Sequence, residues 1–143
     1  MLKEDTIFEL LRSMDLVTNH FIVAWNQLFD EDLSISHILV LSHLQVYGKS
    51  RPSAIAKAIG LTPATLTYLS RKLIAKKLVM REETSQDQRV KYLVISNEGR
   101  TILDKASEDG KLLRKQLIEK LTEDEFHAFL LIYRKLAAML QAT

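Results

Sequence analysis

Two short helical patterns separated by a glycine constrain the fold of this chain more than any other feature. The first pattern, Pro52–Ile59, places three apolar side chains on one small face, and Gly60 follows as a residue that tolerates positive φ at a helix end. The second pattern starts at once, because Thr62 is a typical N-cap residue and Pro63 suits the first helical position. Two short helices joined by a tight glycine turn predict a helix-turn-helix.

The second of these helices has an apolar face and a polar face. Leu66, Leu69 and Leu73 recur at three- and four-residue steps, so they are predicted to point inward. The remaining side chains are predicted to face outward: Ala64, Thr65, Thr67, Tyr68, Arg71 and Lys72. This face is a candidate binding surface, and an ordinary solvated helix face is the alternative.

The hydrophobic period changes after Leu78. Residues 79–81 and 89–95 are β-branched or alternate between apolar and polar, and the polar run 84–88 separates them. This pattern predicts a two-stranded hairpin that follows the helix-turn-helix as a wing.

The flanking segments are predicted to be helices. An apolar stripe from Ile7 to Leu28 predicts an amphipathic helix of about 25 residues, and Ser34 can cap a second helix. Ser96 opens a long helix that Gly110 is expected to kink or loosen, and the capping box Thr122–Glu125 starts a last helix. The stripes of the first and last helices exceed what one small core can bury. They predict a dimer interface, with packing inside one chain as the alternative.

Positive charge is concentrated in the middle of the chain. Residues 49–92 contain ten Lys or Arg and three Asp or Glu, a net charge of +7, whereas the other 99 residues carry −5. Such a basic segment favours a polyanionic partner, with an ordinary solvated surface as the alternative.

Several classes of protein are excluded by what the sequence lacks. Without cysteine there can be no disulfide, thiolate metal site or thiol sensor. No apolar run is long enough to span a bilayer and the N-terminus is charged, so a cytoplasmic protein without membrane contact is expected. No nucleophile–base pairing or phosphate loop is present, so an enzyme is not expected. No cofactor or metal is expected either, because no two of the four histidines have helical ligand spacing: His20, His37, His43 and His127.

The order helix, helix, helix-turn-helix, basic wing, helix, helix resembles the MarR (multiple antibiotic resistance regulator) family over essentially the whole chain. The wing carries the most specific part of the resemblance. Asp87 and Arg89 match the family's Asp-x-Arg, and a short strand to Ile95 leads to Ser96 and then Gly99, where the family has a Leu-Thr-like pair and a glycine.

The chain departs from the family pattern at two positions. Lys77 stands where the family usually has a glycine before the first wing strand, and Ile74 stands where a charged residue is usual. A lysine in the left-handed region would cost roughly 1 kcal/mol at the end of the helix. Neither change removes a group expected to contact DNA.

The resemblance implies roles for particular residues. The helix Thr62–Lys76 would lie in the major groove, Arg89 would reach into the minor groove, and Asp87 would support the wing. A surface ion pair between Asp87 and Arg89 is the alternative. The resemblance and the exposed helix face together predict the DNA-binding residues Thr62, Ala64, Thr65, Thr67, Tyr68, Arg71, Lys72, Arg89 and Lys91.

The predicted fold is mainly α with a small β-wing, in one unit spanning residues 1–143. Residues 34–96 would form the winged helix-turn-helix, and residues 1–33 and 97–143 the dimerisation helices. The resemblance implies a bacterial repressor that binds a pseudo-palindromic operator in double-stranded DNA as a homodimer and is released by a small aromatic effector. No effector site is assigned. The alternatives are a winged-helix protein-interaction module and a DNA-binding protein that responds to no ligand.

Overall fold

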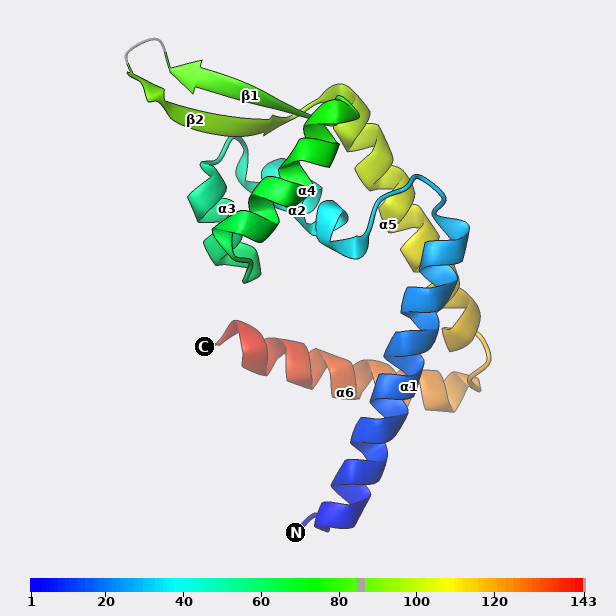
Figure 1. The fold of residues 1–143 in the computed structure, drawn as a ribbon. Coiled ribbons are helices and arrows are strands. Elements are labelled where there is room, and N and C mark those ends of the chain that lie inside the picture. Colours follow the sequence, from blue (N-terminus) through cyan, green and yellow to red (C-terminus); the bar gives the residue numbers. More distant parts are fainter. Residues whose placement is uncertain (85–86, 143) are drawn as a thin grey trace. The chain divides into compact units, whose positions relative to one another are not determined.

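The computed structural model describes residues 1–84 and 87–142, and it describes side chains outside residues 84–90. The elements along the chain (Figure 1) are α1 (Glu4–Leu28), α2 (Ile35–Tyr47), α3 (Pro52–Ile59), α4 (Pro63–Ala75), β1 (Val79–Thr84), β2 (Asp87–Ile95), α5 (Asn97–Ile118) and α6 (Glu123–Gln141). The predicted mainly helical fold with a small β-wing is confirmed. The chain divides into a central unit, residues 26–109, and a terminal unit, residues 1–25 and 110–143.

The central unit contains the helix-turn-helix, and its helix ends follow the local signals in the sequence. Gly60 ends α3 in the left-handed region at φ 73°, as predicted. Thr62 caps α4, because its hydroxyl oxygen accepts a hydrogen bond from the Thr65 N–H at 3.1 Å. The core between these helices and the hairpin contains large side chains that are almost completely inaccessible: Val40, Leu41, Leu44, Ile55, Leu66, Leu73 and Val79.

The wing is an antiparallel hairpin whose register pairs Val79 with Ile95 and Glu82 with Tyr92. A third short segment joins it, because the N–H groups of Ser50 and Leu93 each donate to the other's carbonyl oxygen, at 3.1 and 2.9 Å. The hairpin was predicted, but this third segment was not. It ties the loop before α3 to the base of the wing.

The chain between α4 and α5 is held by a compact set of hydrogen bonds. The Leu78 N–H donates to the Leu73 carbonyl and the Lys77 N–H to the Ile74 carbonyl, both at 2.9 Å, which is the Schellman arrangement of a helix end. Lys77 has φ 62° and therefore lies in the left-handed region, where a side chain is strained. Ser96 fastens α5 to this turn, because its hydroxyl donates to the Lys77 carbonyl at 2.7 Å.

Gly99 lies where no side chain can fit. A Cβ atom placed on it would overlap the Leu78 carbonyl oxygen and lie 2.8 Å from Ile95 Cγ1. The first turn of α5 therefore approaches the start of the wing at backbone distance. This contact gives a physical reason for the glycine three residues after Ser96.

The terminal unit consists of α1 as far as Trp25, the part of α5 from Gly110 onward, and α6. α5 continues as a helix through Gly110, so the predicted long helix is confirmed and Gly110 does not break it. The capping box of α6 forms as predicted, because the Thr122 N–H donates to Glu125 Oε1 at 2.8 Å and the Glu125 N–H donates to Thr122 Oγ1 at 3.2 Å. Within the part of the chain that is described, no helix is both long and apolar enough to cross a membrane.

The helices of the terminal unit leave much apolar surface uncovered. α6 buries none of its side chains among the described residues, and α1 buries only Trp25. The exposed apolar side chains of these two helices include Ile7, Phe8, Leu10, Leu11, Met14, Val17, Phe129, Ile132, Tyr133, Leu136 and Met139.

Candidate nucleic-acid interface

The polar face of α4 is open to solvent. Leu66, Leu69 and Leu73 are buried, and the predicted inward and outward sides of the helix are therefore confirmed. Tyr68 is the most prominent side chain of the outward face, with 72% of its surface exposed. The other side chains that are exposed there are Thr62, Ala64, Thr65, Thr67 and Arg71.

The outward face of α4 offers both donors and acceptors. Within the described residues, neither Tyr68 nor Arg71 has a hydrogen-bond or ion-pair partner for its side chain. The Thr62 hydroxyl donates to Thr65 Oγ1 at 2.8 Å, which leaves the Thr65 hydroxyl hydrogen free to turn outward. The Thr67 hydroxyl donates to the Pro63 carbonyl at 2.9 Å and keeps its acceptor lone pairs. A phenol, a guanidinium and two hydroxyls are the kinds of group that bind base edges and phosphates.

Lys72 is less available than the sequence suggested. Its ammonium lies 3.0 Å from Asp32 Oδ2, and its side chain is about a third exposed. The hydrogen bond from Lys72, and then its positive charge, lower the pKa of the Asp32 carboxyl. Lys72 would have to leave Asp32 in order to bind a phosphate, so its predicted DNA contact requires a change of partner.

His37 is buried at the start of α2. Its Nδ1 accepts a hydrogen bond from the Ser34 N–H at 3.0 Å and lies 2.8 Å from the Ser34 hydroxyl, which completes a capping box. Burial, and then the nearby charge of Lys72, lower the pKa of His37. His37 therefore favours the neutral form with its proton on Nε2. Among the described residues no three His, Cys, Asp or Glu side chains form a group that could hold a metal ion.

The wing contributes Lys91, which is exposed and pairs in register with Glu83. The side chains of Asp87 and Arg89 lie outside the described residues, so their ion pair and the reach of Arg89 into a minor groove stay predictions. The predicted DNA-binding residues thus come from two places in the central unit, the outward face of α4 and the second wing strand.

The base of the wing holds basic residues that sequence reasoning missed. The Lys49 ammonium lies 5.2 Å from the centre of the Tyr92 ring, and Arg51 Cζ lies 5.9 Å from it. Lys49 also pairs with Glu82 at 3.3 Å. Membership of the basic segment was the only sequence signal for these residues, because nothing local indicates that Ser50 pairs with Leu93.

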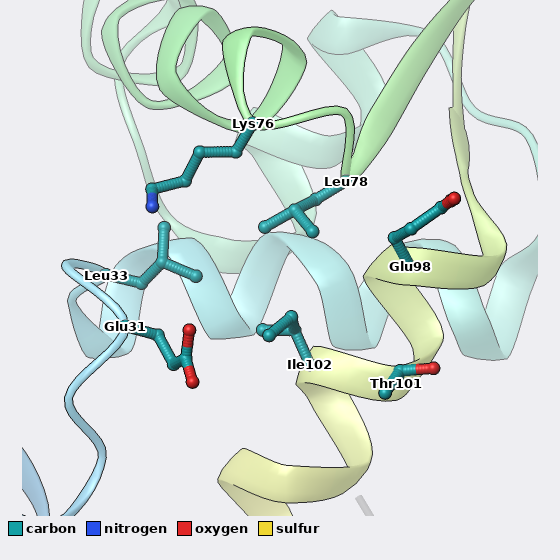
Figure 2. Close-up of a pocket in the computed structure, with 7 residues that line it drawn as sticks. All are labelled: Glu31, Leu33, Lys76, Leu78, Glu98, Thr101 and Ile102. Atoms are coloured by element: carbon teal, nitrogen blue, oxygen red, sulfur yellow. The ribbon is translucent and has the colours of Figure 1, made fainter.

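A cavity of about 400 Å³ lies in the central unit below the end of α4. Figure 2 shows Lys76, Leu33 and Glu31 at one end of the cavity, Leu78 and Ile102 in the middle, and Glu98 and Thr101 at the other end. Glu31 already has a partner, because Lys105 Nζ lies 2.8 Å from Glu31 Oε1; this hydrogen bond lowers the pKa of Glu31 and raises that of Lys105. The cavity is lined by charges of both signs, which indicate no particular ligand.

Comparisons with known proteins agree with this geometry. Residues 33–91, from the end of the loop after α1 into the second wing strand, match the sequence profile of the MarR family. The HTH-type transcriptional repressor MdtR of Bacillus subtilis (strain 168) is 28% identical over 102 residues, which are 71% of this chain and 66% of that protein, just under two thirds of its length.

Two solved structures have the same fold over nearly their whole length. The YusO protein from Bacillus subtilis has a TM-score of 0.80 at 22% identity, with 96% of this chain and 99% of that chain covered. A MarR family protein from Bacillus stearothermophilus has a TM-score of 0.81 at 18% identity, with 99% of each chain covered. At these identities the likeness establishes the winged-helix fold.

Proposed function

Because this chain carries a MarR-family domain at residues 33–91, we propose that it is a sequence-specific DNA-binding regulator of transcription that acts as a homodimer in the cytoplasm. Proteins of this family are transcription regulators and not enzymes. The observation that carries the proposal is the outward face of α4, where Thr65, Tyr68 and Arg71 are exposed beside a two-stranded wing.

The shape of α4 suits the major groove of duplex DNA. A single α-helix fits this groove, and the second helix of a helix-turn-helix usually occupies it. Arg71 is the residue of α4 best suited to bind guanine through its O6 and N7 atoms, since its guanidinium has no partner in the described structure. Tyr68 and Thr65 lie within two turns of it and would contact neighbouring bases or phosphates.

The distribution of charge along the chain also supports DNA as the partner. The basic segment 49–92 lies wholly within the central unit and carries a net +7, whereas the rest of the chain is acidic. Neutralising phosphates with such a surface releases counterions, so binding should weaken steeply as salt increases.

The terminal unit supports a homodimer. α6 is a capped helix of 19 residues, yet it buries none of its side chains within the described protomer. An isolated helix gains little stability without packing, and an exposed apolar face of this extent indicates a partner. A second copy of the chain would cover α1 and α6 around a twofold axis. Two α4 helices about one DNA turn apart would then bind a pseudo-palindromic operator.

Repression is the proposed direction of control. A dimer bound at a promoter would exclude the transcription machinery, and the similar MdtR protein is a transcriptional repressor. Release by a small aromatic effector is the part of the proposal that rests on family resemblance, and we assign it no site. Such a ligand would act only through different affinities for the DNA-binding and the released states.

The decisive experiment measures fluorescence anisotropy of a labelled duplex from the region upstream of the protein's own gene. Arg71→Ala should weaken binding about 5- to 150-fold, the range for removing one bidentate hydrogen-bonded pair with a base. Arg114→Ala is the matched control, because it removes an exposed arginine from α5 in the terminal unit. Weak binding that neither substitution changes would refute the proposal and favour a protein-interaction module.

A further inference from the structure

We infer that Lys49, Arg51 and Tyr92 form a clamp for the phosphate backbone of DNA at the base of the wing. This wing-base clamp deepens the proposed function and depends on it. It would be a second contact, separate from the outward face of α4 and from the tip of the hairpin.

The backbone places these three side chains on one face. Ser50 pairs with Leu93 in an antiparallel bridge, and Arg51 has extended backbone, with φ −72° and ψ 144°. Successive side chains of extended backbone point to opposite faces. Leu93 is buried and faces the core, so its neighbour Tyr92 and the residue after Ser50, Arg51, belong to the outer face. The Lys49 ammonium lies against the Tyr92 ring, which places Lys49 on this face as well.

Two cations lie close to the Tyr92 ring. Lys49 Nζ and Arg51 Cζ both lie within about 6 Å of its centre, the range in which a cation is attracted by an aromatic ring. Two positive groups around one ring repel each other, and an anion close to both would offset this repulsion. The Glu82 carboxylate neutralises one of the two charges, because it pairs with Lys49. The Arg51 guanidinium has no carboxylate or hydrogen-bond partner in the described structure.

The position of the clamp at the start of α3 favours a phosphate of the DNA backbone as the anion that it binds. Arg51 is the residue immediately before α3, and its side chain makes no hydrogen bond that caps this helix. The first helix of a helix-turn-helix crosses the phosphate backbone while the second reads the groove. Arginine and lysine are the side chains that most often bind phosphate oxygens, and these contacts set register without reading sequence. A cation pair at the start of α3 is therefore suited to a phosphate.

Glu82 gives the clamp a further property. Its carboxylate accepts a hydrogen bond from Lys49 in the free protein. A phosphate that binds Lys49 must therefore displace this carboxylate or share the ammonium with it. Glu82→Gln removes this competitor and should increase affinity for any duplex.

The test measures affinity for two duplexes of equal length and composition, one from upstream of the protein's own gene and one of scrambled sequence, across a salt series. Lys49→Gln with Arg51→Gln should weaken binding to both duplexes by the same factor, about tenfold for each side chain. The slope of log affinity against log salt should become shallower by about 0.9 for each phosphate that the variant no longer binds. Glu82→Gln should act in the opposite direction.

Matched controls separate the clamp from a general effect of charge. Lys111→Gln with Lys120→Gln removes the same charge from exposed positions of the terminal unit and should leave the slope unchanged. Tyr92→Phe keeps the ring and should bind as the wild type, whereas Tyr92→Leu should reduce the affinity.

Three results would overturn the inference. If the Lys49 and Arg51 variant has the affinity and the salt dependence of the wild type while Arg71→Ala weakens binding, the clamp is refuted and the proposed function stands. A weakening confined to the upstream duplex would mean base recognition and not phosphate binding. A wild-type protein with no measurable affinity for either duplex would overturn both proposals.

Discussion

Gly99→Ala should lower the free energy of unfolding of this protein by about 2–4 kcal/mol, because the methyl group has no space. The new Cβ would lie 2.8 Å from Ile95 Cγ1 and 3.2 Å from the carbonyl carbon of Leu78, and still closer to the oxygen of that carbonyl. Comfortable carbon–carbon contacts are about 3.5–4.0 Å. Relief therefore requires the first turn of α5 to move away from the wing.

The magnitude follows from the interactions that this movement would damage. The Ser96 N–H donates to the Leu78 carbonyl at 3.0 Å and the Ser96 hydroxyl donates to the Lys77 carbonyl at 2.7 Å. Each contributes about 1 kcal/mol, and forcing an extra methyl into a packed site costs about 1–3 kcal/mol more. Up to about 1 kcal/mol of this loss in unfolding free energy is offset, because alanine is a better helix former than glycine.

Gly110→Ala is the matched control in the same helix. A Cβ there meets no atom closer than 3.9 Å, which is an ordinary van der Waals distance. This substitution should raise the free energy of unfolding by about 0.5–1 kcal/mol, since only the helix propensity changes. Urea unfolding followed by circular dichroism, at one protein concentration for all variants, measures both. Equal effects of the two substitutions, or a Gly99→Ala protein as stable as the wild type, would refute the steric argument.

Three further predictions follow from single residues. Lys77→Gly should stabilise the protein by about 1 kcal/mol in the same urea assay, because glycine adopts φ 62° without the strain of a side chain; a destabilised variant would contradict this. The unfolding free energy should fall as the pH drops below about 6.5, because the unfolded state protonates His37 while its lowered pKa keeps the folded state neutral. His37→Gln should flatten this dependence between about pH 7 and 5, and an unchanged slope would exclude His37 as its cause. Leu136→Glu should convert the proposed dimer to a helical monomer in sedimentation velocity, whereas Arg134→Glu, on the opposite face of α6, should leave the protein dimeric; a dimeric Leu136→Glu protein would place the interface elsewhere.

The effector of the proposed repressor can be sought with the same DNA-binding assay. Aromatic acids titrated against the protein–DNA complex should release the duplex if the resemblance extends to ligand response. A complex that none of them dissociates would instead identify a DNA-binding protein that responds to no such ligand.

The sequence by itself predicted those features that depend on neighbouring residues. Thr62 and Thr122 cap their helices because the hydroxyl and the N–H that it accepts from are three residues apart. Gly60 ends α3 at positive φ because glycine lacks the Cβ that disfavours this conformation. The three-residue and four-residue spacing of Leu66, Leu69 and Leu73 likewise determined which face of α4 is exposed.

Tertiary structure alone decided the features that join distant segments. The pairing of Ser50 with Leu93, which places Lys49 and Arg51 beside Tyr92, links residues 43 positions apart and has no local signature. The ion pair that draws Lys72 to Asp32, and the Leu78 carbonyl that excludes a side chain at Gly99, belong to the same class. Hydrophobic period and capping act within a few residues and therefore appear in the sequence. Contacts across the fold depend on how the helices and the wing pack, and packing is a property of the whole core.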